Sequence, residues 1–182
     1  MTKLPPDKGK GEWLVKFILT HGFVHGAELG VQKGNNLKYL LDNIPHLKMI
    51  GVDIWSDKSV RFNNTKSEDL EKDTTSINYG FYQELLKYTR QVHPRLVLYR
   101  HFTSYATKFV EDESLDFAFV DAGHEYEDVK EDIANWLPKI KKGGYLLGHD
   151  INQAQVRRAV TEMLGYQFKV AKRPKIWYIE KK

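Results

Sequence analysis

The chain has 182 residues, a formal net charge of +4 and no cysteine. The lack of cysteine excludes disulfides, thiolate metal sites and cysteine nucleophiles, and the small positive excess permits an acidic partner without indicating one. No apolar run approaches the roughly 20 residues that cross a bilayer, and the N-terminal residues lack the apolar core of a signal peptide. We therefore expect a single domain over residues 1–182, cytoplasmic and without a membrane partner.

Strand-like and helix-like segments alternate along the chain. The predicted helices are 12–20, 34–44, 80–92, 104–110, 126–140 and 153–164, and the predicted strands between them are 24–30, 49–55, 95–100, 115–123 and 143–151. Two further strand-like runs, 166–171 and 175–180, close the chain with a short link that suits an antiparallel hairpin. This order predicts an α/β fold: a Rossmann-like, doubly wound, mostly parallel seven-stranded sheet with right-handed crossovers.

Residues 56–79 form the longest connection between predicted elements, and they are polar and weakly periodic. A connection of this length is expected to be either disordered or functional. Because such a segment would lie near the edge of the sheet where ligands bind, we interpret it as a loop on the substrate side of the site.

Polar residues follow every predicted parallel strand, at the edge where open α/β sheets bind ligands. They are Glu28, Gly30 and Gly34 after the first strand, Asp53 at the end of the second, Thr103 and Ser104 after the third, Asp121 and His124 after the fourth, and His149 and Asp150 after the fifth. The strands themselves are apolar. A binding site is therefore predicted at the carboxyl ends of the strands.

The turn after the first strand, "GAELGVQKGNN", has the spacing E-x-G-x-x-x-G and not the dinucleotide spacing G-x-G-x-x-G. A pyrophosphate needs a helix N-terminus with free backbone donors, and Glu28 would repel it. A cationic ligand reverses that argument, and S-adenosylmethionine carries both a sulfonium and an ammonium group. The glycines Gly30 and Gly34 permit close approach of the backbone, and Asp53 is placed to accept hydrogen bonds from a ribose diol.

These residues resemble the class I S-adenosylmethionine-dependent methyltransferases, over about residues 12–182 and including the terminal hairpin. The segment "FAFVDAGHEYEDVKEDIANWLPKIKKGGYLLGHD" is similar to the small O-methyltransferases of the macrocin and catechol type. The resemblance implies that Glu28, Gly30, Gly34 and Asp53 bind the cofactor. It also implies that Ser104 contacts the edge of the adenine.

The same resemblance implies a magnesium ion held by Asp121 and a residue after the fifth strand, either Asp150 or His149. His124, three residues after Asp121, stands where the catechol-type enzymes carry the catalytic base, although here the base would be histidine and not lysine. The implied function is O-methylation of a small hydroxylated acceptor, a sugar or a phenol. Mg²⁺ would lower the pKa of the bound hydroxyl, and a monomer and a homodimer are both compatible with the family.

Other functions fit the residues less well. An RNA or protein methyltransferase would keep the cofactor, but the tip of the fourth strand, "DAGH", lacks the Asn/Asp-Pro-Pro-aromatic motif of amino-methylating nucleic-acid enzymes, so nucleic acid is not expected. A non-catalytic binding module of the same fold would not need polar residues at four strand ends. The spacing of the glycine-rich turn counts against a nicotinamide enzyme.

The charges of "DESLD" and "KEDI" are interpreted as solvated faces. For Trp55, both core packing and contact with the adenine are left open.

Overall fold

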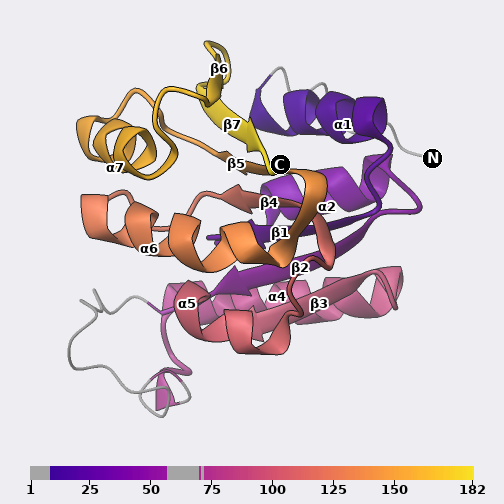
Figure 1. Ribbon diagram of the computed structural model, residues 1–182. Helices are drawn as coiled ribbons and strands as arrows, with labels where there is room; N and C mark the ends of the chain where they lie inside the picture. The colour runs from indigo at the N-terminus through magenta and orange to yellow at the C-terminus, as the bar shows by residue number, and fades with distance from the viewer. Residues whose placement is uncertain (1–8, 57–69, 71) are drawn as a thin grey trace.

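The computed structural model describes residues 9–56, 70 and 72–182. Its sheet has seven strands in the order β3-β2-β1-β4-β5-β7-β6 (Figure 1). The strands are β1 (His25–Leu29), β2 (Lys48–Asp53), β3 (Leu96–Arg100), β4 (Leu115–Val120), β5 (Ile140–Gly148), β6 (Lys169–Ala171) and β7 (Ile176–Glu180). The helices are α1 (Lys10–His21), α2 (Asn35–Asn43), α4 (Ile77–Val92), α5 (Thr103–Ala106), α6 (Tyr126–Trp136) and α7 (Ala154–Leu164), with short 3₁₀ helices η1 (Thr107–Phe109) and η2 (Leu137–Lys139).

The predicted topology is confirmed. Strands β1 to β5 are mutually parallel, β7 pairs antiparallel with β5, and β6 pairs antiparallel with β7. The chain builds outward from β1 to β3 and then returns to place β4 on the other side of β1. Ligands of open α/β sheets bind where the strand order reverses in this way, so the ends of β1 and β4 mark the centre of the expected site.

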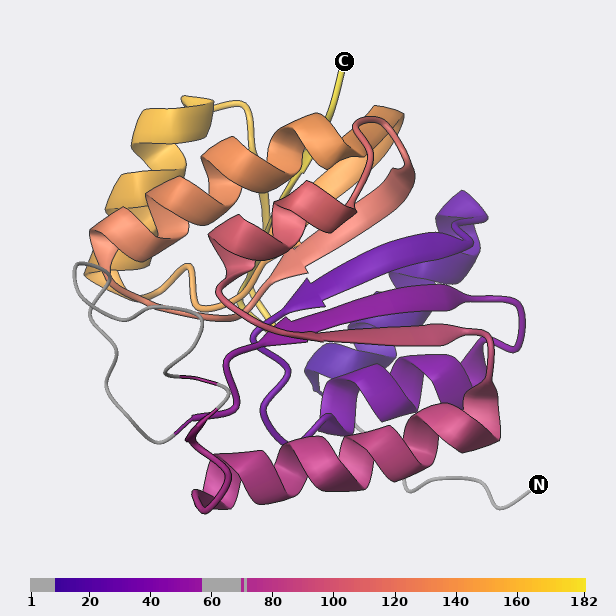
Figure 2. The same cartoon turned by 90° about the horizontal axis from the view of Figure 1, so that it is seen from below.

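Helices cover both faces of the sheet, as the alternation of elements requires. Helices α1, α2 and α4 lie on one face, and α5, α6 and α7 lie on the other (Figure 2). Each face has its own buried apolar cluster, one centred on residues such as Leu14, Leu37 and Phe117 and the other on Val129, Ile133 and Trp136. The two clusters bury both sides of the central strands, which explains why these strands are apolar throughout.

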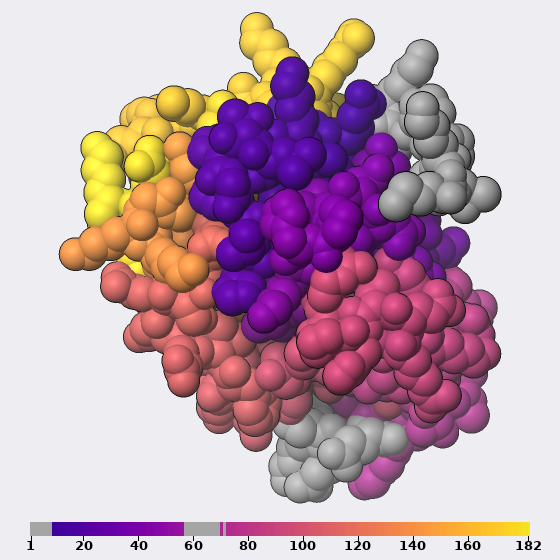
Figure 3. Space-filling view, turned by 90° about the vertical axis from the view of Figure 1, so that its right-hand side faces the viewer, coloured from indigo at the N-terminus to yellow at the C-terminus, as the bar shows by residue number. Residues whose placement is uncertain are grey.

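The first helix is fixed against the last strand. The aromatic ring of Trp13 lies 5.6 Å from that of Tyr178, and the ring of Phe17 lies 5.4 Å from it and 5.2 Å from that of Tyr145. In the space-filling view, α1 (indigo) accordingly lies beside the C-terminal segment (yellow) (Figure 3). This contact determines where the N-terminal end of α1 points, which matters for the site described below.

Several boundaries differ from those predicted. Helix α4 begins at Ile77, inside the predicted loop 56–79, because the Ser76 hydroxyl caps it by accepting a hydrogen bond from the Tyr79 N–H. Strand β6 is shorter than the predicted run 166–171. The greater part of the predicted substrate-side loop, 57–69 and 71, lies outside the described residues. No helix among the described residues has the length and apolar character of a membrane span.

Gly30 allows the chain to turn between β1 and α2 directly against the loop after β4. Its φ is +84°, and a Cβ atom at this position would lie 2.3 Å from the carbonyl oxygen of Asp121. Gly143 has a similar φ of +79°, yet a Cβ there would meet no described atom within 4 Å. The two positions share the left-handed backbone and differ only in the space around them.

We predict that Gly30→Ala destabilises the protein more than Gly143→Ala does. Both substitutions introduce the strain of an L-residue at positive φ, about 1–2 kcal/mol, and the first adds an overpacking cost of about 1–3 kcal/mol against rigid backbone. Urea unfolding of the two variants measures the difference. Equal free energies of unfolding would show that the contact with Asp121 relaxes without cost.

Candidate active site

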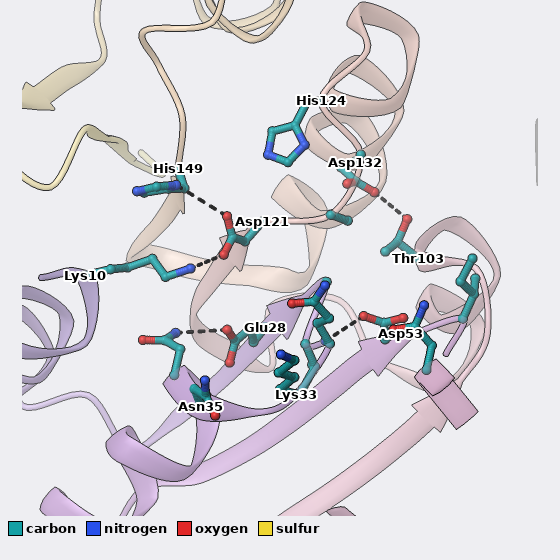
Figure 4. Close-up of a pocket in the computed structure, with 18 of the residues that line it drawn as sticks. Lys10, Glu28, Lys33, Asn35, Asp53, Thr103, Asp121, His124, Asp132 and His149 are labelled. Atoms are coloured by element: carbon teal, nitrogen blue, oxygen red, sulfur yellow. Dashed lines mark hydrogen bonds and ion pairs between the residues drawn. The ribbon is translucent and has the colours of Figure 1, made fainter. Parts of the chain in front are cut away.

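A cavity of about 1180 Å³ lies at the carboxyl ends of the parallel strands, and the loops after β1, β2, β3, β4 and β5 all contribute to its walls. A pocket for one small ligand usually measures about 300–1,000 Å³. The cavity is therefore large enough for a donor and an acceptor together. Figure 4 shows its polar side chains converging from separate strand ends.

Glu28 lies in the floor of this cavity and is only 2% exposed. Its Oε1 accepts a hydrogen bond of 2.9 Å from Asn36 Nδ2, whereas Oε2 has no hydrogen-bond partner among the described residues. Burial raises the pKa of Glu28 from 4.5 to about 8, against the opposing effects of Asn36 and Lys10. A buried carboxylate with one unpaired oxygen is an acceptor for a cation or a hydrogen-bond donor.

The two glycines of the turn have different surroundings. Gly30 lines the cavity, and the backbone beside it continues along the wall through residues 31–33. Gly34, at φ +73°, is the N-cap residue that precedes α2, and a Cβ there would lie 2.3 Å from Leu85 Cδ2. Gly34 is not among the described residues that line the cavity, so packing on α4 accounts for its glycine, and its contact with the cofactor stays a prediction.

Asp53 faces the cavity from the end of β2 and is held by two backbone donors. Gln32 N–H donates to Oδ2 and Trp55 N–H donates to Oδ1, each at 2.8 Å. Both donors belong to residues with positive φ, 47° at Gln32 and 42° at Trp55. Burial raises the pKa of Asp53, although these N–H groups lower it. The carboxylate is thus oriented in advance, with lone pairs left for a ligand.

The alternative left open for Trp55 is settled by its contacts. The indole is fully buried, its Nε1–H donates to the Gln32 carbonyl at 2.8 Å, and its ring lies 4.9 Å from that of Tyr82. Trp55 is therefore a core residue that ties the loop after β1 to the loop after β2.

After β3, the cavity is lined by His101, Phe102 and Thr103, whereas Ser104 is not among the described lining residues. The Thr103 hydroxyl donates to Asp132 Oδ1 at 2.5 Å. Asp132 belongs to "KEDI", and the interpretation of its charge as solvated is wrong: it is 2% exposed, lines the cavity, and burial raises its pKa to about 7. Ser104 as the adenine contact stays a prediction.

The charged run "DESLD" is also only partly solvated. Asp116 accepts hydrogen bonds of 2.8 Å from the backbone N–H groups of Val24 and His25, and Lys141 Nζ lies 2.7 Å from its other oxygen. This carboxylate fixes the start of β1 at the opposite end of the sheet from the cavity, so it has a structural role.

Asp121 lies at the end of β4, with 13% of its side chain exposed. Its Oδ2 forms an ion pair with Nζ of Lys10, and its Oδ1 lies 3.6 Å from His149 Nδ1. Lys10 is the first residue of α1 and lines the cavity. Sequence reasoning missed Lys10, because 111 positions separate it from Asp121 and no local pattern links the two.

His124 and Asp150 join Asp121 in one cluster. Nε2 of His124 lies 2.8 Å from Asp150 Oδ2, and ligand atoms of Asp121, His124 and Asp150 all lie within 4.8 Å of one another. Burial opposes ionisation of Asp150, but His149 and His124 outweigh it and lower the pKa of its carboxyl. Two carboxylates and an imidazole form a donor set that suits a divalent cation.

His149 lies beside this cluster. Its Nε2 makes a hydrogen bond of 2.8 Å to the carbonyl of Pro174, which requires the proton on Nε2. The other nitrogen, Nδ1, lies 3.2 Å from Asp150 Oδ2. A backbone carbonyl that fixes the ring in this way is typical of metal-binding histidines, so the prediction of His149 as an alternative ligand is compatible with its geometry.

Residues 27–151 match the protein family described as "Methyltransferase domain". The chain belongs to this methyltransferase family. It is thus an S-adenosylmethionine-dependent methyltransferase, as the strand-end residues predicted. A segment of the chain is also 36% identical over 77 residues to the "Uncharacterized protein y4gI" of Sinorhizobium fredii, which covers 39% of this chain and 8% of that protein.

Solved structures share the fold of this methyltransferase at low sequence identity. The O-methyltransferase NovP superimposes with a TM-score of 0.67 at 12% identity, covering 94% of this chain and 77% of NovP. CalS11, a TDP-rhamnose 3'-O-methyltransferase of calicheamicin biosynthesis, gives 0.63 at 15% identity, covering 92% and 77%. A putative caffeoyl-CoA O-methyltransferase from Staphylococcus aureus gives 0.63 at 13% identity, covering 98% and 86%.

The residues at the centre of the cavity fit S-adenosylmethionine. Besides Glu28 Oε2, the buried Asn36 Oδ1 also lacks a hydrogen-bond partner among the described residues. Two buried acceptors at one place call for a ligand with several donors, and the ammonium group of S-adenosylmethionine would meet that need. Asp53, one strand further along the sheet, lines the same cavity, and its role as the acceptor for the ribose hydroxyls stays a prediction.

We predict that Glu28→Gln raises thermal stability at alkaline pH. The pKa of Glu28 is higher in the folded protein than in the unfolded chain, so the folded state binds more protons between pH 4.5 and about 8 and loses stability as pH rises through that window. The variant should melt several degrees above the wild type at pH 8.5 and lose this advantage toward pH 5.

Calorimetric melting between pH 5 and pH 9 measures this difference. The matched control is Glu84→Gln, since Glu84 is an exposed helical glutamate whose pKa is lowered by Lys87. The control should show no stabilisation that grows with pH. A constant gap between Glu28→Gln and the wild type at every pH would contradict the raised pKa.

Proposed function

We propose that the enzyme transfers the methyl group of S-adenosylmethionine to a hydroxyl oxygen of a small acceptor, a sugar or a phenol, with a divalent cation at Asp121, His124 and Asp150. The observation that carries the proposal is the convergence of three ligand atoms within 4.8 Å at the wall of a cavity with room for two ligands. The printed names of NovP, CalS11 and the caffeoyl-CoA enzyme, all O-methyltransferases, support an oxygen acceptor.

The donor would lie along the ends of β2 and β1. Asp53 accepts from its ribose, and Glu28 Oε2 accepts from its ammonium group. Holding the donor at both points directs the sulfonium toward the Asp121 cluster, where the acceptor oxygen must approach in line with the methyl–sulfur bond. Such alignment can supply about 7–11 kcal/mol of the barrier.

A bound divalent cation would lower the pKa of the acceptor hydroxyl and fix its position. Because imidazole suits iron, nickel, copper and zinc ions better than it suits Mg²⁺, His124 broadens the choice beyond the predicted magnesium. The oxygen–carbon bond forms as the carbon–sulfur bond breaks, and the electron pair of the broken bond remains on sulfur. The proton of the acceptor leaves to a histidine of the cluster or to water.

The role of His124 as catalytic base is a second mechanism for the same reaction. The 2.8 Å contact between its Nε2 and Asp150 Oδ2 favours it, because a carboxylate orients and stabilises an imidazolium. A ring nitrogen of His124 that binds a cation cannot accept a proton at the same time. Activity in the presence of a chelator would therefore indicate the base, and loss of activity would indicate the metal.

The reaction itself is tested by incubating the protein with donor labelled in its methyl group and a panel of phenols, catechols and nucleotide sugars, with and without Mg²⁺ or Mn²⁺. We expect label in a hydroxylated small molecule. Transfer to RNA or protein substrates and to none of the panel would overturn the proposal.

We predict that Asp150→Asn weakens Mn²⁺ binding at least about tenfold, since it removes a charged ligand from the cluster. Electron paramagnetic resonance titration measures the free ion. The control is Asp112→Asn, because Asp112 is an exposed aspartate that pairs with Lys139 away from the cavity, and it should bind Mn²⁺ as the wild type does. Identical affinities in all three proteins would place the ion elsewhere.

A further inference from the structure

The side chain of Lys10 brings a positive charge to a part of the cavity that is otherwise acidic. Its Nζ pairs with Asp121 Oδ2, lies 5.6 Å from the centre of the Phe119 ring, and is close enough to Glu28 to lower the pKa of that carboxyl. Figure 4 shows the extended side chain of Lys10 reaching Asp121, with Glu28 close by. We propose that Lys10 binds the α-carboxylate of the methyl donor and releases Asp121 when it does so.

The direction of the donor follows from the register of the strands. Glu28 stands level with Gly51 of β2 on one side and with Phe119 of β4 on the other. With the ribose at Asp53 on β2, the amino-acid end must extend over β1 toward β4, one or two strand spacings of about 4.8 Å away. That end carries an ammonium and a carboxylate on the same carbon.

The two charges of this end need opposite partners at short range. Glu28 Oε2 serves the ammonium, but the same carboxylate, with Asp121 beside it, would repel the α-carboxylate. A cation next to Glu28 removes that repulsion. The cavity-lining lysines Lys33 and Lys38 approach aromatic rings of α4 instead, with Nζ at 5.2 Å from the Phe81 ring and 5.8 Å from the Tyr88 ring. Lys10 is the described lining lysine paired with a carboxylate of the strand ends.

An exchange of partners follows from this arrangement. In the structure Lys10 neutralises Asp121, which is one of the three residues proposed to hold the divalent cation. If Lys10 turns to the carboxylate of the donor, Asp121 Oδ2 becomes available to that cation. Binding of the donor and of the metal would then reinforce each other, and by linkage the effect is reciprocal. This inference rests on the proposed use of S-adenosylmethionine and adds the residue that recognises its acidic group.

The test compares two ligands by isothermal calorimetry: S-adenosylhomocysteine and 5'-deoxy-5'-(3-aminopropylthio)adenosine, which lacks only the carboxylate. The wild type should prefer the first by roughly tenfold to a hundredfold, as expected for a charge-assisted contact. In Lys10→Met the two affinities should become nearly equal, and Lys10→Arg should restore part of the preference. Lys16→Met, an exposed lysine of the same helix, should behave as the wild type.

A lysine that merely anchored α1 would give another result: Lys10→Met would weaken both ligands by the same factor and leave their ratio unchanged, which would overturn the proposal. Failure of the wild type to bind either ligand would instead overturn the proposed function. Melting temperatures of the variants show that the folded protein is compared in each case.

The exchange itself is tested with Mn²⁺. S-adenosylhomocysteine should raise the affinity of the wild type for Mn²⁺ several-fold, and the analogue without the carboxylate should not. Lys10→Met should bind Mn²⁺ more tightly than the wild type before any ligand is added. Equal Mn²⁺ affinity with both ligands would show that Lys10 does not leave Asp121.

Discussion

The site depends on the burial of one carboxylate. Glu28 stands at the end of the central strand β1, where strands on both sides and helices above exclude water, and only one of its oxygens has a partner among the described residues. An ionised group in such a place is costly unless a donor or a cation satisfies it. Two neighbours reduce this cost. Asn36 donates a hydrogen bond to one oxygen of Glu28, and Lys10 supplies a positive charge nearby.

The fold produces this environment through the order of its strands. Because β4 returns to the far side of β1, the loops after these two strands meet at the middle of the sheet and must pass very close to each other. Gly30 makes this passage possible, and the hydrogen bond from Asp121 N–H to the Leu29 carbonyl, at 2.8 Å, holds the two strand ends level. The same constraint that permits the fold thus places Glu28 and Asp121 side by side.

Much of this arrangement could be predicted from the sequence. The pattern of the apolar residues located the strands, and the alternation of strands with helices predicted a parallel sheet. In such a sheet the strands end at one shared edge, which is where Glu28, Asp53, Asp121 and Asp150 were expected. These inferences succeeded because strand direction and burial depend on local patterns. The start of α4 was missed for a local reason as well, since the cap at Ser76 lies within a polar stretch that has no periodic signal.

Lys10 and Asp132 could not be found in this way. Lys10 lies two residues before the predicted helix 12–20, and Asp132 lies in a run interpreted as solvated. Only the packing of the helix that carries each residue determines where its side chain ends. The aromatic contacts of Trp13 and Phe17 with β7 direct the start of α1 to the cavity, and the packing of α6 buries Asp132 against Thr103. Contacts between distant segments are set by tertiary structure, which no window of the sequence contains.

The charges along the cavity explain why a lysine belongs in a site built to attract cations. The donor carries two positive charges and one negative charge, and a divalent cation would add two more positive charges. Asp53, Asp121 and Asp150 line the cavity, and Glu28 adds a further negative charge once it ionises, so without a counter-ion these carboxylates would repel one another. Lys10 offsets this repulsion at Asp121, and the rings of His124 and His149 contact the carboxylate of Asp150. Because Lys10 holds Asp121 by an ion pair alone, a ligand that carries a positive charge can take its place there.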